Sequence, residues 1–281
     1  MIEREYGYGL LTGWKIPMWS RRQLLVDGFK QEGFSKFAPC KRTATQGLKD
    51  ALEDTHRGAV FLIPALKNND GYEVRQVVPI TDTENRVDRL FSVTIDANNA
   101  MTFYPGAPAN IQAIVDSFNE HRGLVRTAEV TACLVHLIKH LGGTHFPVGR
   151  GAYFIPPATL ETWRKIAAVV ESASFKNPSQ VHLAKLVIDP DSIKAIIAGL
   201  TGEIEQRLNE IEGEIKSGKL KKKALIARQG EALALEEKIK EYEALLGIGL
   251  ESLRSSVDRT EESIMRATIL ASAARETSNA A

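Results

Sequence analysis

Apolar residues recur at helical spacing along two neighbouring segments in the C-terminal part of the chain. Isoleucine and leucine return every three or four positions up to residue 215, and residues 225–246 repeat the pattern after a break at Ser217 and Gly218. An apolar stripe at this spacing needs a partner surface, and a short polar break lets two such helices pack against each other. We therefore predict a coiled-coil helical hairpin over residues 191–247.

Alternation of apolar and polar residues replaces the helical pattern between residues 58 and 104. Residues 68–71, Asn-Asn-Asp-Gly, form a turn signal between a short apolar run and a returning strand. A second pair of strand-like runs flanks residues 97–99. These features predict a four-stranded antiparallel meander, with the polar residues 81–89 as a surface loop.

The whole pattern divides the chain into four regions. We expect a helical N-terminal region over residues 1–57 and an α+β core over residues 58–190, followed by the hairpin. Residues 248–281 carry a last helical stripe and a small, polar tail that we expect to fray. The predicted fold class is α+β: an antiparallel β-sheet with flanking helices, a winged-helix-like hairpin segment, and a protruding antiparallel coiled-coil hairpin.

The winged-helix-like segment covers residues 126–156. A predicted helix ends at Gly142 and Gly143, and two short strands follow with Arg150 in the turn between them. An arginine at the tip of a wing can enter a minor groove or contact phosphate. Alternatively, the strands form a β-hairpin that completes a sheet, and the glycines beside Arg150 serve only the geometry of the turn.

Overall composition excludes a global electrostatic function. The chain has 281 residues, of which 43% are hydrophobic and 25% charged, and its formal net charge is only +1. Any electrostatic function therefore has to be local. No apolar run reaches the roughly 18–20 residues that span a bilayer, so we expect no membrane partner. Two distant cysteines, Cys40 and Cys133, and no recognisable signal peptide favour a reducing cytoplasm.

Charge is segregated along the predicted hairpin. Residues 216–228 hold six lysines and arginines and no acid, whereas residues 202–214 hold five glutamates and one arginine. This cationic tip could contact a phosphate backbone or an acidic protein surface. Alternatively, it is a solvated loop that its lysines keep soluble. The candidate binding residues at the tip are Lys219, Lys221, Lys222 and Lys223.

A second basic region covers residues 14–49, with eight cations, two acids and five interleaved aromatic residues. Cations that contact phosphates, together with rings that stack on bases, are what binding of single-stranded nucleic acid requires. Alternatively, the aromatic residues form the core of a small helical subdomain. The candidate phosphate-contacting residues are Arg21, Arg22, Lys41 and Arg42, and the aromatic residues are Trp14, Trp19, Phe29, Phe34 and Phe37.

Candidate metal and catalytic chemistry is weak. Cys133, His136 and His140 share one side of a predicted helix, and His145 follows it, but the spacing matches no common zinc module. We favour a buried cysteine with partly exposed histidines over a metal-dependent enzyme, and predict no metal ligand and no cofactor. No nucleophile elbow, P-loop or dinucleotide motif is present, so we name no catalytic residue and lean towards a non-enzymatic protein.

One segment resembles a family of uncharacterised bacterial and phage proteins. The residues that carry the resemblance are Gly142-Gly143 and the run from Arg150 to Pro156, followed by a helix, a strand and a long helical pair. Proteins of that family have a glycine-x-tyrosine-phenylalanine-valine-proline strand ahead of a helical hairpin, and Ile155 stands here in place of the valine. The resemblance implies a link to phages or mobile elements and supplies no site residues.

Together these patterns predict a non-enzymatic, nucleic-acid-associated protein. We expect it to bind the phosphate backbone of DNA or RNA through local basic patches, independently of sequence, because lysine clusters supply charge without a fixed hydrogen-bond geometry. The rival expectation is a protein-interaction or oligomeric assembly module, or an inhibitor, that docks through its hairpin on an acidic protein surface. We expect a homo-oligomer in either case.

Overall fold

The computed structural model describes residues 7–56, 60–64, 70–81, 84–147, 151–218 and 220–279, with side chains described up to residue 271. The chain divides into two compact units. Helices and antiparallel strands make up both, so the predicted α+β class is confirmed. The sheet unit comprises Lys15–Val135 and Ile166–Gln180, and the bundle unit comprises Met1–Trp14, His136–Lys165 and Val181–Ala281.

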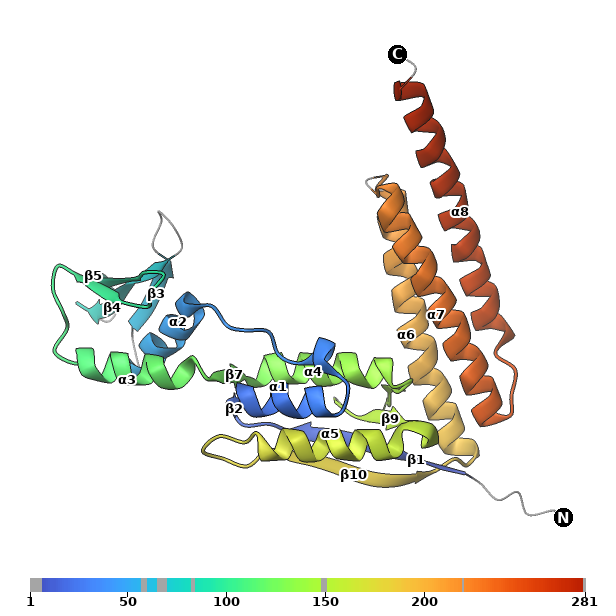
Figure 1. The fold of residues 1–281 in the computed structure, drawn as a ribbon, viewed down its shortest axis with the longest axis horizontal. Helices are drawn as coiled ribbons and strands as arrows, with labels where there is room; N and C mark the ends of the chain where they lie inside the picture. Colours follow the sequence, from blue (N-terminus) through green and yellow to red (C-terminus); the bar gives the residue numbers. More distant parts are fainter. Residues whose placement is uncertain are drawn as a thin grey trace. The chain divides into compact units, whose positions relative to one another are not determined.

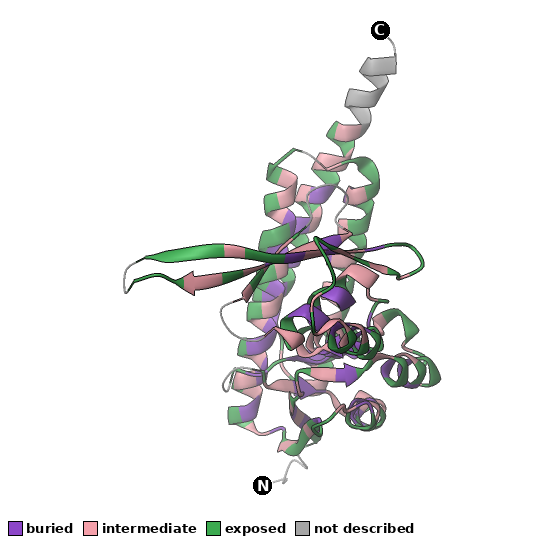
Figure 2. Ribbon diagram, turned by 90° about the vertical axis from the view of Figure 1, so that its left-hand side faces the viewer, coloured by how far each residue is buried: buried purple, intermediate pink, exposed green. Residues whose placement is uncertain are grey.

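The sheet unit is built around the predicted four-stranded antiparallel meander, which is confirmed with the strand order β3-β4-β5-β6. The loop expected over residues 81–89 was wrong, because β5 begins at Asn85 and pairs with β4 as far as Pro79. These polar residues can be strand residues because the far ends of β4 and β5 are mostly exposed (Figure 2). The strands are β3 (Val60–Pro64), β4 (Gly71–Pro79), β5 (Asn85–Ile95) and β6 (Met101–Tyr104).

Two helices, α2 (Ala44–Thr55) and α3 (Ile111–His121), cover one face of this sheet (Figure 1). Helix α2 begins at Thr43, which forms a reciprocal capping box with Gln46. Side chains alternate along a strand, so every second residue of the sheet points at these helices. The resulting core comprises Leu48, Ala51, Leu52, Val74, Phe91, Val93, Ile95, Ile114 and Phe118.

The rest of the sheet unit combines helices with a two-stranded sheet. Strands β2 and β7 pair antiparallel, and Phe29 on α1 is fully buried. Helices α4 and α5 contribute residues to both units. The elements are β2 (Trp19–Arg21), α1 (Arg22–Gln31), the short 3-10 helix η1 (Ser35–Phe37), β7 (Leu124–Arg126), α4 (Thr127–His140) and α5 (Leu160–Ser172).

The bundle unit contains a second four-stranded sheet, with the strand order β10-β1-β9-β8. Strand β1 lies within the region predicted to be helical, so that prediction was wrong for these residues. Their partner β9 is distant in the sequence, and local patterning does not reveal the pairing of Leu11 with Phe154. The strands are β1 (Tyr8–Lys15), β8 (Thr144–His145), β9 (Tyr153–Ile155) and β10 (Gln180–Val187), and a 3-10 helix η2 (Pro157–Thr159) follows β9.

The winged-helix-like segment takes the second of its two predicted forms. Strands β8 and β9 pair antiparallel and belong to the four-stranded sheet of the bundle unit, so the hairpin completes that sheet. Arg150, the predicted wing residue, lies outside the described residues.

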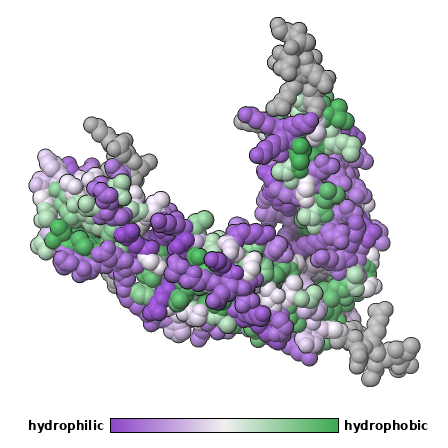
Figure 3. Space-filling model, in the orientation of Figure 1, coloured by the Kyte–Doolittle hydropathy of each residue, from purple (hydrophilic) through white to green (hydrophobic). Residues whose placement is uncertain are grey.

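Three long helices form the bundle: α6 (Pro190–Lys216), α7 (Lys222–Leu246) and α8 (Glu251–Asn279). Helices α6 and α7 cover the residues of the predicted hairpin, and α8 continues through most of the polar tail (Figure 1). All three helices bury apolar stripes in one core, so each arm packs on α8 as well as on the other arm. Hydrophilic side chains cover much of the bundle in Figure 3. None of the helices within the described residues is both long and apolar enough to cross a membrane.

Candidate nucleic-acid interface

The turn between α6 and α7 presents lysines to solvent. Gly218 has a φ of +67° and ends α6 in the left-handed conformation that glycine favours. Lys221, Lys222 and Lys223, here called the tip lysines, follow at the start of α7 and are all exposed. None of the three forms an ion pair with a residue that the structure describes. Lys219, the fourth predicted tip residue, lies outside the described residues.

The tip lysines occupy the helix end that favours the opposite charge. The N-terminus of a helix carries a partial positive charge, so a cation there costs about 0.3–1 kcal/mol where an acid would stabilise by a similar amount. Helix α7 has no acid in its first turn and no side-chain cap at Lys221. The N–H groups of Lys222 and Lys223 have no acceptor within the helix. Backbone and side chains therefore place positive charge together, which suits an anion.

The acidic stem of the hairpin is largely paired with cations of the same two helices. Four of the five glutamates that we counted on α6 form ion pairs, so the negative charge of the stem is smaller than the sequence predicts. Lys216 and Arg228, which we counted with the tip, take part in these pairs. Within the described residues, unpaired positive charge at the turn is therefore confined to the tip lysines. The pairs are Glu203–Lys238 (3.0 Å), Glu210–Arg207 (2.5 Å), Glu212–Lys216 (3.4 Å) and Glu214–Arg228 (2.6 Å).

Arg228 belongs to a network that ties α6 to α7. Its guanidinium pairs with Glu214 on α6 and, at 2.5 Å, with Glu231 on its own helix. Arg207 on α6 reaches Glu231 in turn. Arg228 is only 23% exposed and has two carboxylates beside it, which makes it a bundle residue and not a binding residue.

In the sheet unit, Arg42 is buried in an ion-pair cluster. The side chains of Arg42 and Asp50 are 7% and 1% exposed and form an ion pair. Arg126 pairs with the other oxygen of Asp50 and, at 2.5 Å, with Glu53. The guanidinium carbons of Arg42 and Arg126 lie 5.6 and 5.3 Å from the ring centre of Trp19. These five residues form the Asp50 cluster. Because Arg42 is buried and paired there, it cannot meet a phosphate, and we remove it from the predicted interface.

Strand pairing assembles the Asp50 cluster. The register of β2 and β7 sets Trp19 directly opposite Arg126. The ring of His121 closes the site from another side, with an edge contact to Trp19 at 4.6 Å between ring centres. The sequence did not indicate that Asp50 pairs with Arg42, because the predicted basic region ends at residue 49.

The other predicted cations of residues 14–49 differ in exposure. Arg21 and Lys41 are exposed. Arg22 is half-buried, and its Nε donates a hydrogen bond to the carbonyl of Cys40 at 2.9 Å. Arg21 and Lys41 therefore remain candidates for a phosphate contact, whereas Arg22 is already held by the backbone.

The aromatic residues of that region serve packing. Trp19 lies in the Asp50 cluster and Phe29 is fully buried. Phe34 and Phe37 are half-buried and lie against each other, with 6.3 Å between ring centres. Trp14 stacks on Tyr153 at 5.2 Å in the bundle unit. These contacts favour the packing alternative over a stacking surface for bases.

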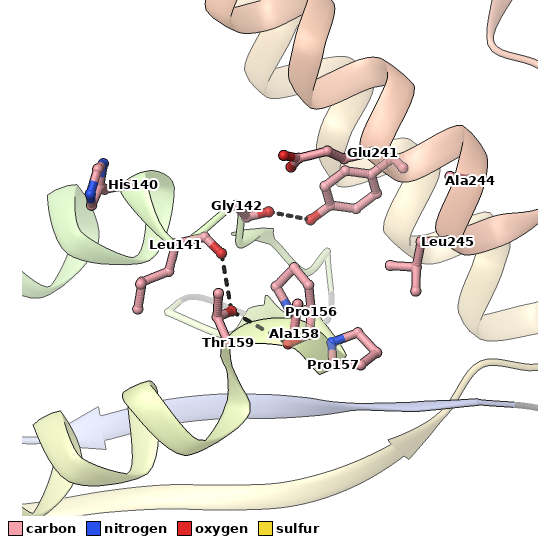
Figure 4. Close-up of a pocket in the computed structure, with 11 residues that line it drawn as sticks. His140, Leu141, Gly142, Pro156, Pro157, Ala158, Thr159, Glu241, Ala244 and Leu245 are labelled. Atoms are coloured by element: carbon pink, nitrogen blue, oxygen red, sulfur yellow. Dashed lines mark hydrogen bonds between the residues drawn. The ribbon is translucent and has the colours of Figure 1, made fainter.

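The bundle unit contains a cavity of about 550 Å³. Its polar groups bond to one another: the Tyr242 hydroxyl donates to the carbonyl of Gly142 at 2.8 Å, and the Thr159 hydroxyl donates to that of Leu141 at 3.1 Å (Figure 4). The remaining lining is largely apolar, from Pro156, Pro157, Ala158, Ala244 and Leu245, with His140 and Glu241 as its ionisable groups. Such a lining offers no nucleophile with an adjacent base.

A second cavity of the bundle unit, of about 340 Å³, is lined by ionisable groups. Lys238 donates to Glu203 at 3.0 Å and to the carbonyl of Gly143 at 2.9 Å. Burial lowers the pKa of Lys238, against the opposing effect of Glu203. Thr144 donates to the same carboxylate at 3.0 Å. The pair thus joins α6, α7 and the turn before β8, a structural role that the sequence did not indicate.

The predicted cysteine and histidine positions form no metal site in the part of the chain that the structure describes. No group of three histidine, cysteine, aspartate or glutamate side chains there could hold a metal ion. Burial raises the pKa of the Cys133 thiol from 9.0 to about 11, so this thiol stays protonated at neutral pH.

The geometry defines an α+β protein whose helical hairpin ends in unpaired lysines. A family model described as a family of unknown function, DUF6744, matches residues 20–275, and the chain belongs to this family. No curated protein and no solved structure matches the chain. Membership in an uncharacterised family agrees with the predicted resemblance and assigns no activity.

Proposed function

We propose that this protein is a non-enzymatic nucleic-acid-binding protein that contacts the phosphate backbone with the tip lysines. The observation that carries the proposal is that Lys221, Lys222 and Lys223 are exposed, consecutive and unpaired at the N-terminus of α7. A lysine at the N-terminus of a helix weakens that helix, so stabilisation of the fold does not explain why these three lysines are present. A role in binding an anion explains their position.

The chemistry of lysine favours backbone contact over base reading. An ammonium group is a point charge without the bidentate geometry that distinguishes one base from another. We therefore expect binding that depends weakly on sequence and strongly on salt. Exposed Arg21 and Lys41 are further candidates for phosphate contact.

The proposal also places the protein in the cytoplasm and links it to phages or mobile elements. The cytoplasmic location is supported by its two free cysteines, Cys40 and Cys133. The phage link rests on the sequence resemblance around Tyr153 and Pro156.

The test is the salt dependence of oligonucleotide binding, measured by fluorescence anisotropy. Each phosphate contact contributes a slope of about −0.7 to −0.9 in log affinity against log salt, so three contacts lower affinity about 20- to 40-fold between about 50 and 200 mM salt. The Lys221→Gln/Lys222→Gln/Lys223→Gln variant should remove most of this dependence.

A matched control changes the net charge equally elsewhere. Lys176, Lys194 and Lys240 are exposed, and each has a carboxylate partner. Their triple glutamine variant should bind like the unmodified protein. Equal losses in both variants, or no binding at low salt, would contradict the proposal.

A second candidate function is self-assembly through the bundle. Met265, Ile269 and Leu270 on α8 are 61%, 63% and 71% exposed, and Ile226 on α7 is 55% exposed. Met265 and Ile269 lie one turn apart on α8, and apolar side chains exposed side by side favour a second copy of the chain as partner. Light scattering at several concentrations should show a dimer that salt does not dissociate, and Ile269→Lys should make it monomeric. A monomer at all concentrations would exclude this function.

A further inference from the structure

The face of the β3–β6 sheet opposite α2 and α3 carries exposed aromatic side chains. Alternation along the strands directs Val74 and Phe91 towards the helices and their neighbours in each strand towards the other face. On that other face Tyr104 is 66% exposed and Phe61 is 38% exposed. Neither ring is needed for the core, so the face on which they lie is a candidate binding surface.

Strand register arranges this face in two neighbouring rows. One row runs from Phe61 on β3 to Arg75 on β4 and Arg89 on β5. The next row runs across all four strands and ends at Tyr104 on β6. We call these two rows the open face: Phe61, Arg75 and Arg89 in the first, and Ile63, Glu73, Ser92 and Tyr104 in the second.

Arginine already stacks on the most exposed ring. The guanidinium of Arg89 lies 5.4 Å from the ring centre of Tyr104, and its Nη2 donates to the Ser92 hydroxyl at 2.5 Å. Arg75 donates to Glu73 at 2.8 Å, and the Nε of Arg89 lies 3.6 Å from the same carboxylate. Two guanidinium groups and one carboxylate leave the open face with a positive charge beside its rings.

We propose that the open face binds unpaired bases of single-stranded nucleic acid. Tyr104 and Phe61 provide rings on which bases stack, and Arg75 and Arg89 contact the intervening phosphates. Every base has a π-face, so such stacking tolerates sequence, and arginine adds a cation–π contribution. A sheet face with exposed rings suits bases that are already unstacked, and not the interior of a duplex.

The charge of the open face selects a nucleic acid over a protein partner. Aromatic residues and arginine are enriched at protein–protein interfaces too, so the residue types alone do not decide. The two arginines outnumber the one glutamate beside them, and this net positive charge is complementary to phosphates. The inference rests on the proposed function for the class of ligand, and it places a second site in a different unit of the chain.

The test compares a labelled single-stranded oligonucleotide with a labelled duplex at low salt. Tyr104→Leu and Phe61→Leu should each weaken single-strand binding by about 5- to 150-fold, the range that one stacked base supplies, and leave duplex binding within about twofold. Tyr8→Leu is the matched control, because Tyr8 is also 45% exposed with a cation, Lys185, 4.2 Å from its ring centre.

The outcomes separate the two proposals. Loss of single-strand binding in the Tyr104 and Phe61 variants, with no effect of the tip-lysine variant, supports the open face and contradicts the tip. The reverse result overturns the open face and leaves the proposed function standing. Absence of any nucleic-acid binding overturns both. Photo-crosslinking of an iodouracil-containing single strand should label Tyr104 or Phe61, and labelling confined to other residues also overturns the inference.

Discussion

The Asp50 cluster and the hairpin tip hold positively charged side chains in opposite environments. In the cluster, Arg42 and Arg126 surround a carboxylate that is 1% exposed. At the tip, Lys221, Lys222 and Lys223 are exposed, and no described residue pairs with them. The first group holds the fold together, and the second is free to bind something outside it. A run of positive charge in a sequence therefore indicates a binding surface only where the carboxylates nearby in space do not balance it.

The largest effect is expected inside the cluster. Asp50→Asn keeps the shape of the side chain but leaves two guanidinium groups without their shared carboxylate. Breaking a buried ion pair from one side costs about 3–5 kcal/mol of unfolding free energy. Chemical denaturation measures this loss.

Glu53→Gln is the matched control for that loss. Glu53 pairs with the same Arg126 but is 41% exposed, so its neutralisation should cost less than about 1 kcal/mol. Similar losses in the two variants would mean that the cluster is not the buried element described here.

The sequence predicted elements whose signals are local. The meander followed from alternation and turn residues, and α6 and α7 followed from stripes at helical spacing. Strand β1 was missed because its pairing with Phe154 and Ile155 depends on residues far along the chain. The prediction of a loop over residues 81–89 was wrong. The polar residues correctly indicated exposure to solvent, but an exposed strand is as polar as a loop.

The candidate site was harder to predict because charge counting ignores partners in space. Arg42 was counted as free although Asp50 follows eight residues later. Arg228 was counted with the tip, and Glu214 with the stem, although the two side chains pair at 2.6 Å. The tip lysines, Arg21 and Lys41 kept the predicted exposure, and the open face of the sheet depends on a register that no local pattern reveals.

A smaller effect distinguishes Arg228 from Lys222, two cations of the same hairpin. Arg228→Gln removes the link to Glu214 and Glu231 and should cost about 1 kcal/mol in unfolding free energy, with the salt slope of binding unchanged. Lys222→Gln should leave the unfolding free energy unchanged and reduce the salt slope by about one phosphate contact. If the two variants behaved identically in both assays, the assignment of Arg228 to the stem and of Lys222 to the binding tip would be contradicted.

The last effect concerns the two cysteines, is absent at neutral pH and appears only at alkaline pH. Burial raises the pKa of Cys133 from 9.0 to about 11, so the folded state holds its proton where the unfolded state has lost it. The unfolding free energy should therefore fall as the pH rises from about 9 to about 11. Cys133→Ala should make this fall shallower in pH-dependent denaturation, and Cys40→Ala, which removes a neighbouring charge that adds to the effect of burial, should make it shallower to a smaller extent. An unchanged slope in Cys133→Ala would contradict the burial of this thiol.

The most direct test of the central claim measures stability and binding together in one variant, Lys221→Glu/Lys222→Glu/Lys223→Glu. Acids at the N-terminus of α7 should raise the unfolding free energy by about 0.3–1 kcal/mol per substitution, because they match the helix dipole. The same variant should lose more than about tenfold in nucleic-acid affinity at low salt. A more stable protein that binds weakly is the predicted result, and a variant that binds as tightly as the unmodified protein would contradict the account.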